Sequence, residues 1–316
     1  MWRYLLLMLC VFSMTSAVAY HTNNYPIHRI IYITFDGTRW QDVFLERVYF
    51  PKLWGKYAKN AIFYGMRDSH TAMEVASIPI SLPSYHSQMS GAVQPCDGNE
   101  CGRIKVETLT ENIVHQLKLN KKEVAVFASW PEIGLAAESV AGTIVSNVGN
   151  VPMVDPDTQL PDQMMDDINQ QQAMDHPAKQ DRLDKYTFAQ GLHYLEKYQP
   201  RFLWISLDDA DEAAHAGNLD NYHAALSFYD DALDILFTRL KALHMDQDTL
   251  VIVTTDHGRG NGLNWIHHGP LYPESKQTWA FVINGQLKSM GENNGIAYYS
   301  TLSIRPTIEK ALEVGS

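Results

Sequence analysis

HRIIYITFDG, residues 28–37, is a run of β-branched and aromatic residues that ends in an acidic residue and a glycine. Similar β-rich runs follow along the chain, separated by longer stretches with the spacing of amphipathic helices. They cover residues 123–128, 201–207, 249–255 and 278–283. Short strands that alternate with helices predict an α/β fold built on a largely parallel central sheet.

The clearest helical pattern spans residues 219–243, where apolar side chains recur every three or four positions. The segment 147–182 is different, because Pro, Asp, Gln and Met dominate it and three consecutive glutamines lie within it. Its composition predicts an irregular insertion over one end of the sheet, either a lid over the site or a solvated excursion. Weaker helical patterns cover residues 106–119, 183–198 and 306–312.

The first 19 residues have the pattern of a signal peptide. Arg3 precedes an apolar run over residues 4–12, and small residues follow at 17–19. The apolar run is shorter than the roughly 20 residues that span a bilayer. We expect cleavage after Ala19, export to the periplasm or the exterior, and a mature chain of one catalytic domain, residues 20–316, without a transmembrane segment.

Two cysteines, Cys96 and Cys101, lie beyond this leader in a loop rich in Gly, Asn and Asp. In an exported protein such a pair predicts a local disulfide. The alternative is a Cys/His metal site, but no second pair with suitable spacing accompanies the cysteines.

The chain has 25 basic and 36 acidic residues, which gives a net charge of −11. Such a surface argues against a nucleic-acid backbone as a partner. The excess of acid does not have to be evenly spread, because carboxylates that bind metal ions cluster. The sequence does not indicate an oligomeric state.

Acidic residues follow three of the predicted strands directly. They are Asp36, the group Asp208, Asp209 and Asp211, and Asp256, which precedes His257. Sites in open α/β sheets form outside the carboxyl ends of the strands, and like charges gathered there repel each other unless cations neutralise them.

Histidines accompany these acids. Asp211 and His215 are four residues apart, so one helical turn would bring both to one face. His268 lies in a loop rich in Gly and Asn further along the chain. Mixed carboxylate and imidazole ligands suit zinc better than magnesium or calcium, which prefer oxygen.

A candidate nucleophile lies in SLPSYHSQMSG, residues 81–91. Pro83 fits the first turn of a helix and Gly91 its end, so we expect Ser81 to be the N-cap. The start of a helix is a ready phosphate site, and a metal-bound serine hydroxyl there would ionise and attack phosphorus. Taken alone, Ser81 has an equally simple interpretation as a cap.

Five short motifs, in their order along the chain, resemble those of the alkaline phosphatase superfamily, particularly its nucleotide pyrophosphatase/phosphodiesterase-like branch. The similarity runs from about Ile30 to the start of a helix at Arg305. It implies an alkaline phosphatase-like three-layer α/β/α sandwich and an exported hydrolase of phosphate esters that forms a phosphoseryl intermediate on two zinc-like ions. The motifs are Phe35-Asp36-Gly37, Ser81-Leu82-Pro83-Ser84, Asp211-x-x-x-His215, Asp256-His257-Gly258 and His268-Gly269.

The resemblance also implies which residues hold the two metal ions. One ion would be bound by Asp211, His215 and His268. His267 could replace His268, but the ligand in the family directly precedes glycine, as His268 does. The other ion would be bound by Asp36, Asp256, His257 and the oxygen of Ser81.

Two other functions compete with this one. Sulfatases have a similar fold and a Cys/Ser-x-Pro-Ser-Arg signature, but Tyr85 stands in place of the arginine and His257 in place of an asparagine. A pseudoenzyme that keeps its metals for structure would have no need of a serine at Ser81.

The resemblance implies a small-molecule phosphate ester or a nucleotide-like compound as substrate. The choice between phosphate monoesters and diesters stays open. Asn99, Arg103 and Lys105 follow the nucleophile and are candidates to bind the phosphate oxygens. The arginine that follows the nucleophile in alkaline phosphatases is absent, because Leu82 stands there. This absence favours a phosphodiesterase or a phosphatase of broad specificity.

Overall fold

The computed structural model of the chain describes residues 26–65, 73–175, 180–287 and 299–314. The signal-peptide prediction for residues 1–19 lies outside these ranges. Within them, none of the helices combines the length and the apolar character that crossing a membrane would require.

The core of the fold is a seven-stranded sheet with the strand order β2-β9-β7-β1-β6-β4-β5. The central strands pair in parallel, β1 with both β6 and β7, and β4 with β5 and β6, whereas β9 pairs antiparallel with β7 and β2. Every residue of β1 is buried, as expected for a parallel strand that is covered on both faces. The strands are β1 (Arg29–Phe35), β2 (Ala61–Tyr64), β4 (Val124–Ala128), β5 (Val145–Val148), β6 (Phe202–Leu207), β7 (Thr249–Thr254) and β9 (Ala280–Ile283).

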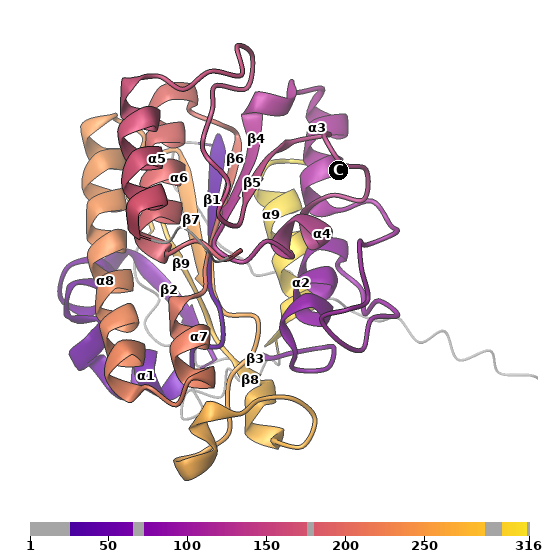
Figure 1. Ribbon diagram of the computed structural model, residues 1–316, viewed down its shortest axis with the longest axis vertical. Coiled ribbons are helices and arrows are strands. Elements are labelled where there is room, and N and C mark those ends of the chain that lie inside the picture. Colours follow the sequence, from indigo (N-terminus) through magenta and orange to yellow (C-terminus); the bar gives the residue numbers. More distant parts are fainter. Residues whose placement is uncertain (1–25, 66–72, 176–179, 288–298, 315–316) are drawn as a thin grey trace, which may run out of the picture.

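Helices cover both faces of this sheet, which gives three layers (Figure 1). One face carries α1 (Trp40–Phe44), α5 (Gln163–Asp175), α6 (Asp184–Tyr198), α7 (Asp209–His215) and α8 (Leu219–Ala242). The other carries α2 (Ser81–Ser90), α3 (Leu109–Leu117), α4 (Ile133–Ala137) and α9 (Ile304–Ala311).

Alternate residues of β1 enter the two hydrophobic cores. Ile31 and Ile33 pack into the core on the side of α6 and α8, whereas Ile30 and Tyr32 pack into the core on the side of α2 and α9. A strand that is apolar on both sides therefore holds the centre of the molecule.

The α/β fold with a largely parallel central sheet is confirmed, with two corrections. The strand predicted over residues 278–283 is divided. Its first part lies in β8 (Gln277–Thr278), which belongs to a small sheet with β3 (Met73–Glu74) and β10 (Tyr299–Ser300). Its second part is β9, which joins the central sheet antiparallel.

The segment 147–182 was predicted to be irregular, and this is wrong for its second half. Helix α5 contains the three consecutive glutamines and packs against α6. Gln172 is 3% exposed, and its Nε2 donates to Asn150 while its Oε1 accepts from Gln190. Partners for buried glutamines are tertiary contacts that composition does not reveal.

Cys96 and Cys101 form a disulfide in the loop between α2 and α3. The closed loop is short, so the chain-entropy relation gives it only about 2 kcal/mol. Reduction should therefore lower the urea midpoint slightly rather than unfold the protein. Titration of the unreduced, denatured protein should find no free thiol from this pair, and two free thiols would contradict the disulfide.

Candidate active site

The acidic residues at the strand ends come together because of the strand register. Phe35 of β1 is level with Leu207 of β6, and Thr34 is level with Thr254 of β7. The chain leaves all three strands at the same edge of the sheet. Asp36, the turn into α7, and the pair Asp256 and His257 consequently meet there.

One cluster of ligand atoms lies on α7 and the loop that follows β7. Asp211 Oδ2 is 2.9 Å from His215 Nε2, and His215 Nε2 is 3.1 Å from His268 Nε2. All three ligand atoms lie within 4.8 Å of one another. Helix α7 produces this arrangement, since residues four apart share one face.

A second cluster surrounds Ser81. Its Oγ lies 3.4 Å from Asp36 Oδ1 and 3.3 Å from His257 Nε2. His257 Nε2 is in turn 3.2 Å from Asp256 Oδ2. Asp36, His257 and Asp211 also lie within 4.8 Å of one another, so the two clusters adjoin through Asp211.

Backbone carbonyls orient two of the imidazoles. His257 Nδ1 is 2.9 Å from the oxygen of Gly258, and His268 Nδ1 is 3.0 Å from the oxygen of Pro79. A ring nitrogen that donates to a carbonyl carries the proton, so Nε2 of each ring presents its lone pair to the cluster. This pairing is typical of histidines that bind metal ions.

The pKa values of these histidines also favour metal binding. Burial lowers the pKa of His257 to about 4, and burial together with the charge of His257 lowers the pKa of His268 to about 3. Both rings are therefore neutral near pH 7, which is the form that binds cations. His215 differs, because its hydrogen bond with Asp211 raises its pKa.

The carboxylates repel one another. Burial and the charges of Asp256 and Asp211 hold the pKa of Asp36 well above its usual value, and burial raises the pKa of Asp256 to about 6. Burial raises the pKa of Asp211 too, but the charge of Arg259, the hydrogen bond with His215 and the charges of His257 and His215 together outweigh it and hold that pKa well below its usual value. Such a group of acids calls for positive charge.

These residues fit divalent cations. Asp256 Oδ2 is buried and accepts no hydrogen bond from the described part of the chain, whereas its Oδ1 accepts from Gly37 N at 3.0 Å. An orphaned carboxylate oxygen is costly unless an ion binds it. Ligands of a tetrahedral zinc ion, bonded at about 2.0–2.1 Å, stand roughly 3.3 Å apart. The spacings within both clusters, 2.9–3.8 Å, are close to that value.

Ser81 is the first residue of α2, and the expectation that it is the N-cap is wrong. Ile80, with extended φ and ψ, is the N-cap, and its side chain makes no capping hydrogen bond. The Ser81 hydroxyl points instead to Asp36 and His257. Gly91 ends the helix in the left-handed conformation, as the sequence predicts.

Helix α2 is fastened to the strand ends by residues whose role the sequence did not reveal. Tyr85 OH donates to Asp36 Oδ2 at 3.0 Å, which leaves Oδ1 facing Ser81. Ser84 Oγ donates to the backbone oxygen of Asp256 at 2.7 Å. In the sequence Tyr85 was notable only because it replaces the arginine of the sulfatase signature, but in the structure it positions Asp36.

Arg259 is a second residue that sequence analysis missed. It is 1% exposed, and its guanidinium donates to Asp211 and to the backbone oxygen of Gly37. Gly37 has a φ of +59°, and a Cβ there would overlap the Asp211 carboxylate. Its position two residues after His257 could have indicated a role at the site. That role depends on Gly37 and Asp211, which are distant in the chain.

Asp184 organises the turn from β6 into α7. The fully buried carboxylate accepts from Asp208 N at 2.7 Å, Asp209 N at 2.8 Å, Ser129 Oγ at 2.6 Å and Tyr229 OH at 2.8 Å. Its place at the start of α6 is what brings it beside this turn. The position of Asp211 therefore depends on a residue far away in sequence.

Asp184→Ala should destabilise the protein by about 3 kcal/mol or more, because several buried donors would lose their acceptor. Urea unfolding measures this change. Asp184→Asn, which keeps one acceptor oxygen, should cost less. An alanine variant as stable as the parent would show that water replaces the carboxylate.

The three candidate phosphate-binding residues have different places. Asn99 lies at the start of α2, where its Oδ1 accepts from Leu82 N at 3.0 Å. Arg103 donates to the backbone oxygens of Gly134 and Glu138 at 2.7 and 2.6 Å and so fastens α4. Lys105 is exposed. The structure thus brings Asn99 beside Ser81 and gives Arg103 a structural role.

His267 and His268 are also distinguished. The ring of His268 stacks on His257 with 3.9 Å between centroids, whereas His267 is exposed and stacks on Tyr272. The geometry favours His268 as the ligand.

Comparison with known proteins identifies relatives of this arrangement. Residues 32–307 match the family described as type I phosphodiesterase / nucleotide pyrophosphatase. No curated protein matches the chain in sequence.

Solved structures share the fold. The alkaline phosphatase of the Antarctic bacterium TAB5 is 14% identical, with a TM-score of 0.55 over 92% of this chain and 99% of that chain. A variant of that enzyme has been solved with magnesium bound. The phosphonate monoester hydrolase of Agrobacterium radiobacter is 13% identical, with a TM-score of 0.59 over 90% of this chain and 74% of the other.

A third structure, a protein of Bacteroides thetaiotaomicron described as a sulfatase, is 13% identical. Its TM-score is 0.58 over 92% of this chain and 72% of the other. At such identities the likeness shows the fold alone, and the predicted alkaline phosphatase-like fold is confirmed.

Proposed function

Because the chain belongs to the type I phosphodiesterase / nucleotide pyrophosphatase family, we propose that it is an exported, metal-dependent phosphodiesterase with Ser81 as its nucleophile. That it hydrolyses esters follows from the family. The metal dependence, the phosphoseryl intermediate and the preference for diesters are the proposal.

One observation carries it. Ser81 Oγ lies at the start of α2 and within 3.4 Å of both Asp36 Oδ1 and His257 Nε2. A serine with only a structural role would have no reason to turn its hydroxyl toward buried carboxylate and imidazole ligands. The position at the positive end of a helix also favours an anionic phosphate.

The first cation would be held by Asp211, His215 and His268, and the second by Asp36, Asp256, His257 and Ser81. Bound there, the cations would neutralise the carboxylates, lower the pKa of the serine hydroxyl and offset charge on the phosphate oxygens. The donors are nitrogen and oxygen, which favours zinc.

The residues of the chain then carry the following steps. Ser81 Oγ gives its proton to solvent and attacks phosphorus, and the bond from phosphorus to the leaving oxygen breaks, so that the alkoxide departs and takes up a proton from solvent. Tyr85, through its hydrogen bond to Asp36 Oδ2, keeps Oδ1 beside the serine. Asn99, whose Oδ1 accepts from Leu82 N, would use its amide N–H groups to donate to a nonbridging oxygen. Water then cleaves the phosphoseryl bond with a second inversion.

The preference for a diester rests on the arginines. A dianionic monoester needs additional positive groups near the phosphate. Arg259 is bound to Asp211 and to backbone oxygens, and Arg103 is bound to Gly134 and Glu138. All three nitrogens of the Arg259 guanidinium are thus engaged, and Nη1 of Arg103 is engaged as well, so a singly charged diester fits better.

Release of nitrophenol tests this function directly. Bis-nitrophenyl phosphate should be cleaved with a higher kcat/KM than nitrophenyl phosphate, and nitrophenyl sulfate should be cleaved slowly or not at all. A preference for the sulfate would favour the sulfatase function, for which the fold provides a precedent. No hydrolysis of any of the three by metal-loaded protein would favour the pseudoenzyme.

Removal of metal should abolish this activity. We expect about two zinc ions per chain by elemental analysis, and loss of hydrolysis on dialysis against EDTA with recovery on adding zinc. One calcium ion and no transition metal would contradict the assignment. The donors explain the expectation, because neutral imidazoles bind zinc more strongly than calcium.

Export is supported by the disulfide. A bond between Cys96 and Cys101 persists in an oxidising compartment and is rare in the cytosol. The leader expected over residues 1–19 would carry the chain there.

A further inference from the structure

A further group of metal-ligating side chains lies between α2 and the loop that follows it. A ring nitrogen of His86 and the sulfur atoms of Cys96 and Cys101 all lie within 4.8 Å of one another. His86 belongs to α2, and the two cysteines lie in the loop between α2 and α3. This group shares no residue with the ligands proposed for the two catalytic cations.

His86 has the features of a histidine that lacks a ligand. It is 3% exposed, and among the described residues its Nε2 has no hydrogen-bond partner. The ring is hydrogen-bonded to the backbone of Leu135, through Nδ1 because Nε2 is unpartnered. His257 and His268 are held in the same way, with Nδ1 at a backbone carbonyl. Because a buried polar atom without a partner is costly, the free nitrogen indicates a ligand.

The protonation state of His86 suits a cation. Burial lowers the pKa of its imidazole by more than the hydrogen bond at Leu135 raises it. The ring is therefore neutral near pH 7, and Nε2 keeps the lone pair that a metal ion needs.

The disulfide keeps a metal ion out of this group, because each sulfur is bonded to the other. Reduction by a dithiol gives each cysteine one electron and one proton, and the dithiol becomes a disulfide. A zinc ion can then replace the two thiol protons, which pass to solvent. Exchange with another disulfide oxidises the two cysteines again and releases the ion, while the oxidant leaves as two thiols.

The loop is held near His86 by contacts other than the disulfide. Asn99, which lies between the two cysteines, accepts at Oδ1 from Leu82 N of α2. Arg103, just after the second cysteine, donates to two backbone oxygens at α4. The reduced thiols therefore stay close to the imidazole, in a protein that the loss of one short loop closure does not unfold.

We propose that His86, Cys96 and Cys101 form a redox-controlled zinc site, which binds one ion through two thiolates and an imidazole when the cysteines are reduced. Thiolate and imidazole ligands favour zinc, and three protein ligands leave the fourth position to water. The inference stands apart from the proposed hydrolysis, because these three residues serve no step of that reaction.

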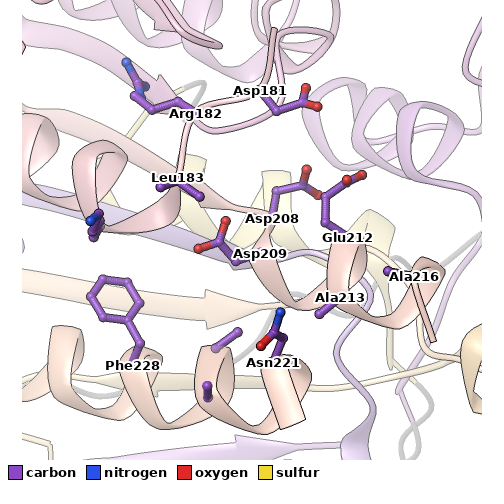
Figure 2. Close-up of a pocket in the computed structure, with 13 residues that line it drawn as sticks. Asp181, Arg182, Leu183, Asp208, Asp209, Glu212, Ala213, Ala216, Asn221 and Phe228 are labelled. Carbon is purple, nitrogen blue, oxygen red and sulfur yellow. The ribbon is translucent and has the colours of Figure 1, made fainter. Parts of the chain in front are cut away.

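The acidic cavity between α7, α8 and the start of α6 does not offer the same ligands. Its volume is about 500 Å³, and Figure 2 shows the carboxylates of Asp208, Asp209 and Glu212 around it. Among the described residues that line it there is no cysteine and no histidine. A metal ion bound there would have oxygen ligands, so a thiolate signal distinguishes the two places.

Cobalt, which replaces zinc and absorbs light, is the probe for the site. The protein is reduced with a phosphine, desalted under argon and titrated with cobalt. We expect one ion per chain to bind with the charge-transfer absorption of a thiolate–cobalt bond, and zinc to remove this absorption. The disulfide-bonded protein should not show it. The proposed catalytic ligands contain no sulfur, so the absorption reports this site whether or not the protein hydrolyses phosphate esters.

Zinc itself gives a second measurement. Elemental analysis should find one zinc ion more per chain in the reduced protein than in the disulfide-bonded protein, whatever number the catalytic site holds. A reduced and folded protein that gains neither the thiolate absorption nor the additional zinc would overturn the proposal.

His86→Asn separates a site with three ligands from a pair of free thiols. Asparagine keeps a polar group for the backbone of Leu135 but has no imidazole nitrogen. The reduced variant should bind cobalt at least about tenfold more weakly in competition with a chelator, since even outer partners of a metal site contribute that much. The matched control is His115→Asn, an exposed histidine of α3 outside the group, which should bind like the parent.

Equal affinities of His86→Asn and the parent would overturn the proposal. If His86→Asn fails to fold in a thermal melt, the double variant Cys96→Ser and Cys101→Ser decides. It keeps His86 and the remaining cysteine, Cys10. It should lose both the thiolate absorption and the additional zinc, and their persistence would show that the ion binds elsewhere.

Discussion

Replacing Ser81 by alanine should lower kcat/KM by about a thousandfold or more and leave the protein folded with its metals. The Ser81 hydroxyl has no capping bond to lose, since Ile80 is the N-cap, and within the described part of the chain its Oγ faces Asp36 and His257 at 3.4 and 3.3 Å. What remains in the variant is attack by a water molecule. Hydrolysis of bis-nitrophenyl phosphate, urea unfolding and elemental analysis measure the three quantities.

Ser87→Ala is the matched control for this substitution. Ser87 is a fully buried serine of the same helix, and its Oγ donates to the Pro83 oxygen within the helix. Its loss should change kcat/KM little. If Ser81→Ala keeps most of its activity, Ser81 is structural.

The stereochemistry at phosphorus gives an independent result for Ser81. A phosphoseryl intermediate requires two inversions, so a phosphorus-chiral diester should be hydrolysed with net retention. Net inversion would mean that water attacks directly and that Ser81 is not the nucleophile, whatever the metals do.

Asp256→Asn should have opposite effects on activity and on the stability of the metal-free protein. We expect loss of one zinc ion and a fall in kcat/KM of about a hundredfold or more, because the proposed function makes the buried Oδ2 a metal ligand. Without metal, the same change should stabilise the fold by roughly 2–3 kcal/mol near neutral pH, because it removes a carboxylate whose pKa burial raises to about 6.

The pH dependence follows from the sign of that shift. A carboxyl group whose pKa is higher in the folded state binds its proton more tightly there, so its contribution is most favourable below its unfolded pKa, about 3.9. This contribution is lost as the pH rises through about 6. Metal-free parent protein should therefore lose stability over this range, and Asp256→Asn should lose less. Urea midpoints at several pH values, measured in EDTA, give the comparison.

Asp42→Asn is the control for the stability of metal-free Asp256→Asn. Asp42 is also fully buried, but it is paired with Arg39 at 2.7 and 2.8 Å and accepts from Tyr222 OH at 2.7 Å. Breaking that pair should destabilise the protein. If metal-free Asp256→Asn is destabilised as well, then Asp256 has a structural partner and is not an orphaned ligand.

The sequence predicted the centre of the fold better than its edges. Strands β1, β6 and β7 are continuous apolar runs because both of their faces are buried, and their composition makes them visible. Strand β5 was missed, since Val145–Val148 is only partly buried at the edge of the sheet and has no strong apolar pattern.

The sequence likewise predicted some residues of the site and not others. Asp36, Asp211 and Asp256 could be predicted because each directly follows a strand or lies one helical turn beyond it. Tyr85 and Arg259 could not, because their roles arise from contacts with Asp36 and Asp211. Those contacts connect segments that only the folded chain brings together.

The attachment of the site to the three central strands has a consequence for divergence between relatives. β1 is flanked by β6 and β7, so Asp36, Asp211 and Asp256 are held by the best-buried part of the sheet, while β2, β5 and α5 lie at the periphery. Substitutions and insertions at the periphery can accumulate without moving the reacting groups. A fold shared at about 14% identity is consistent with this arrangement.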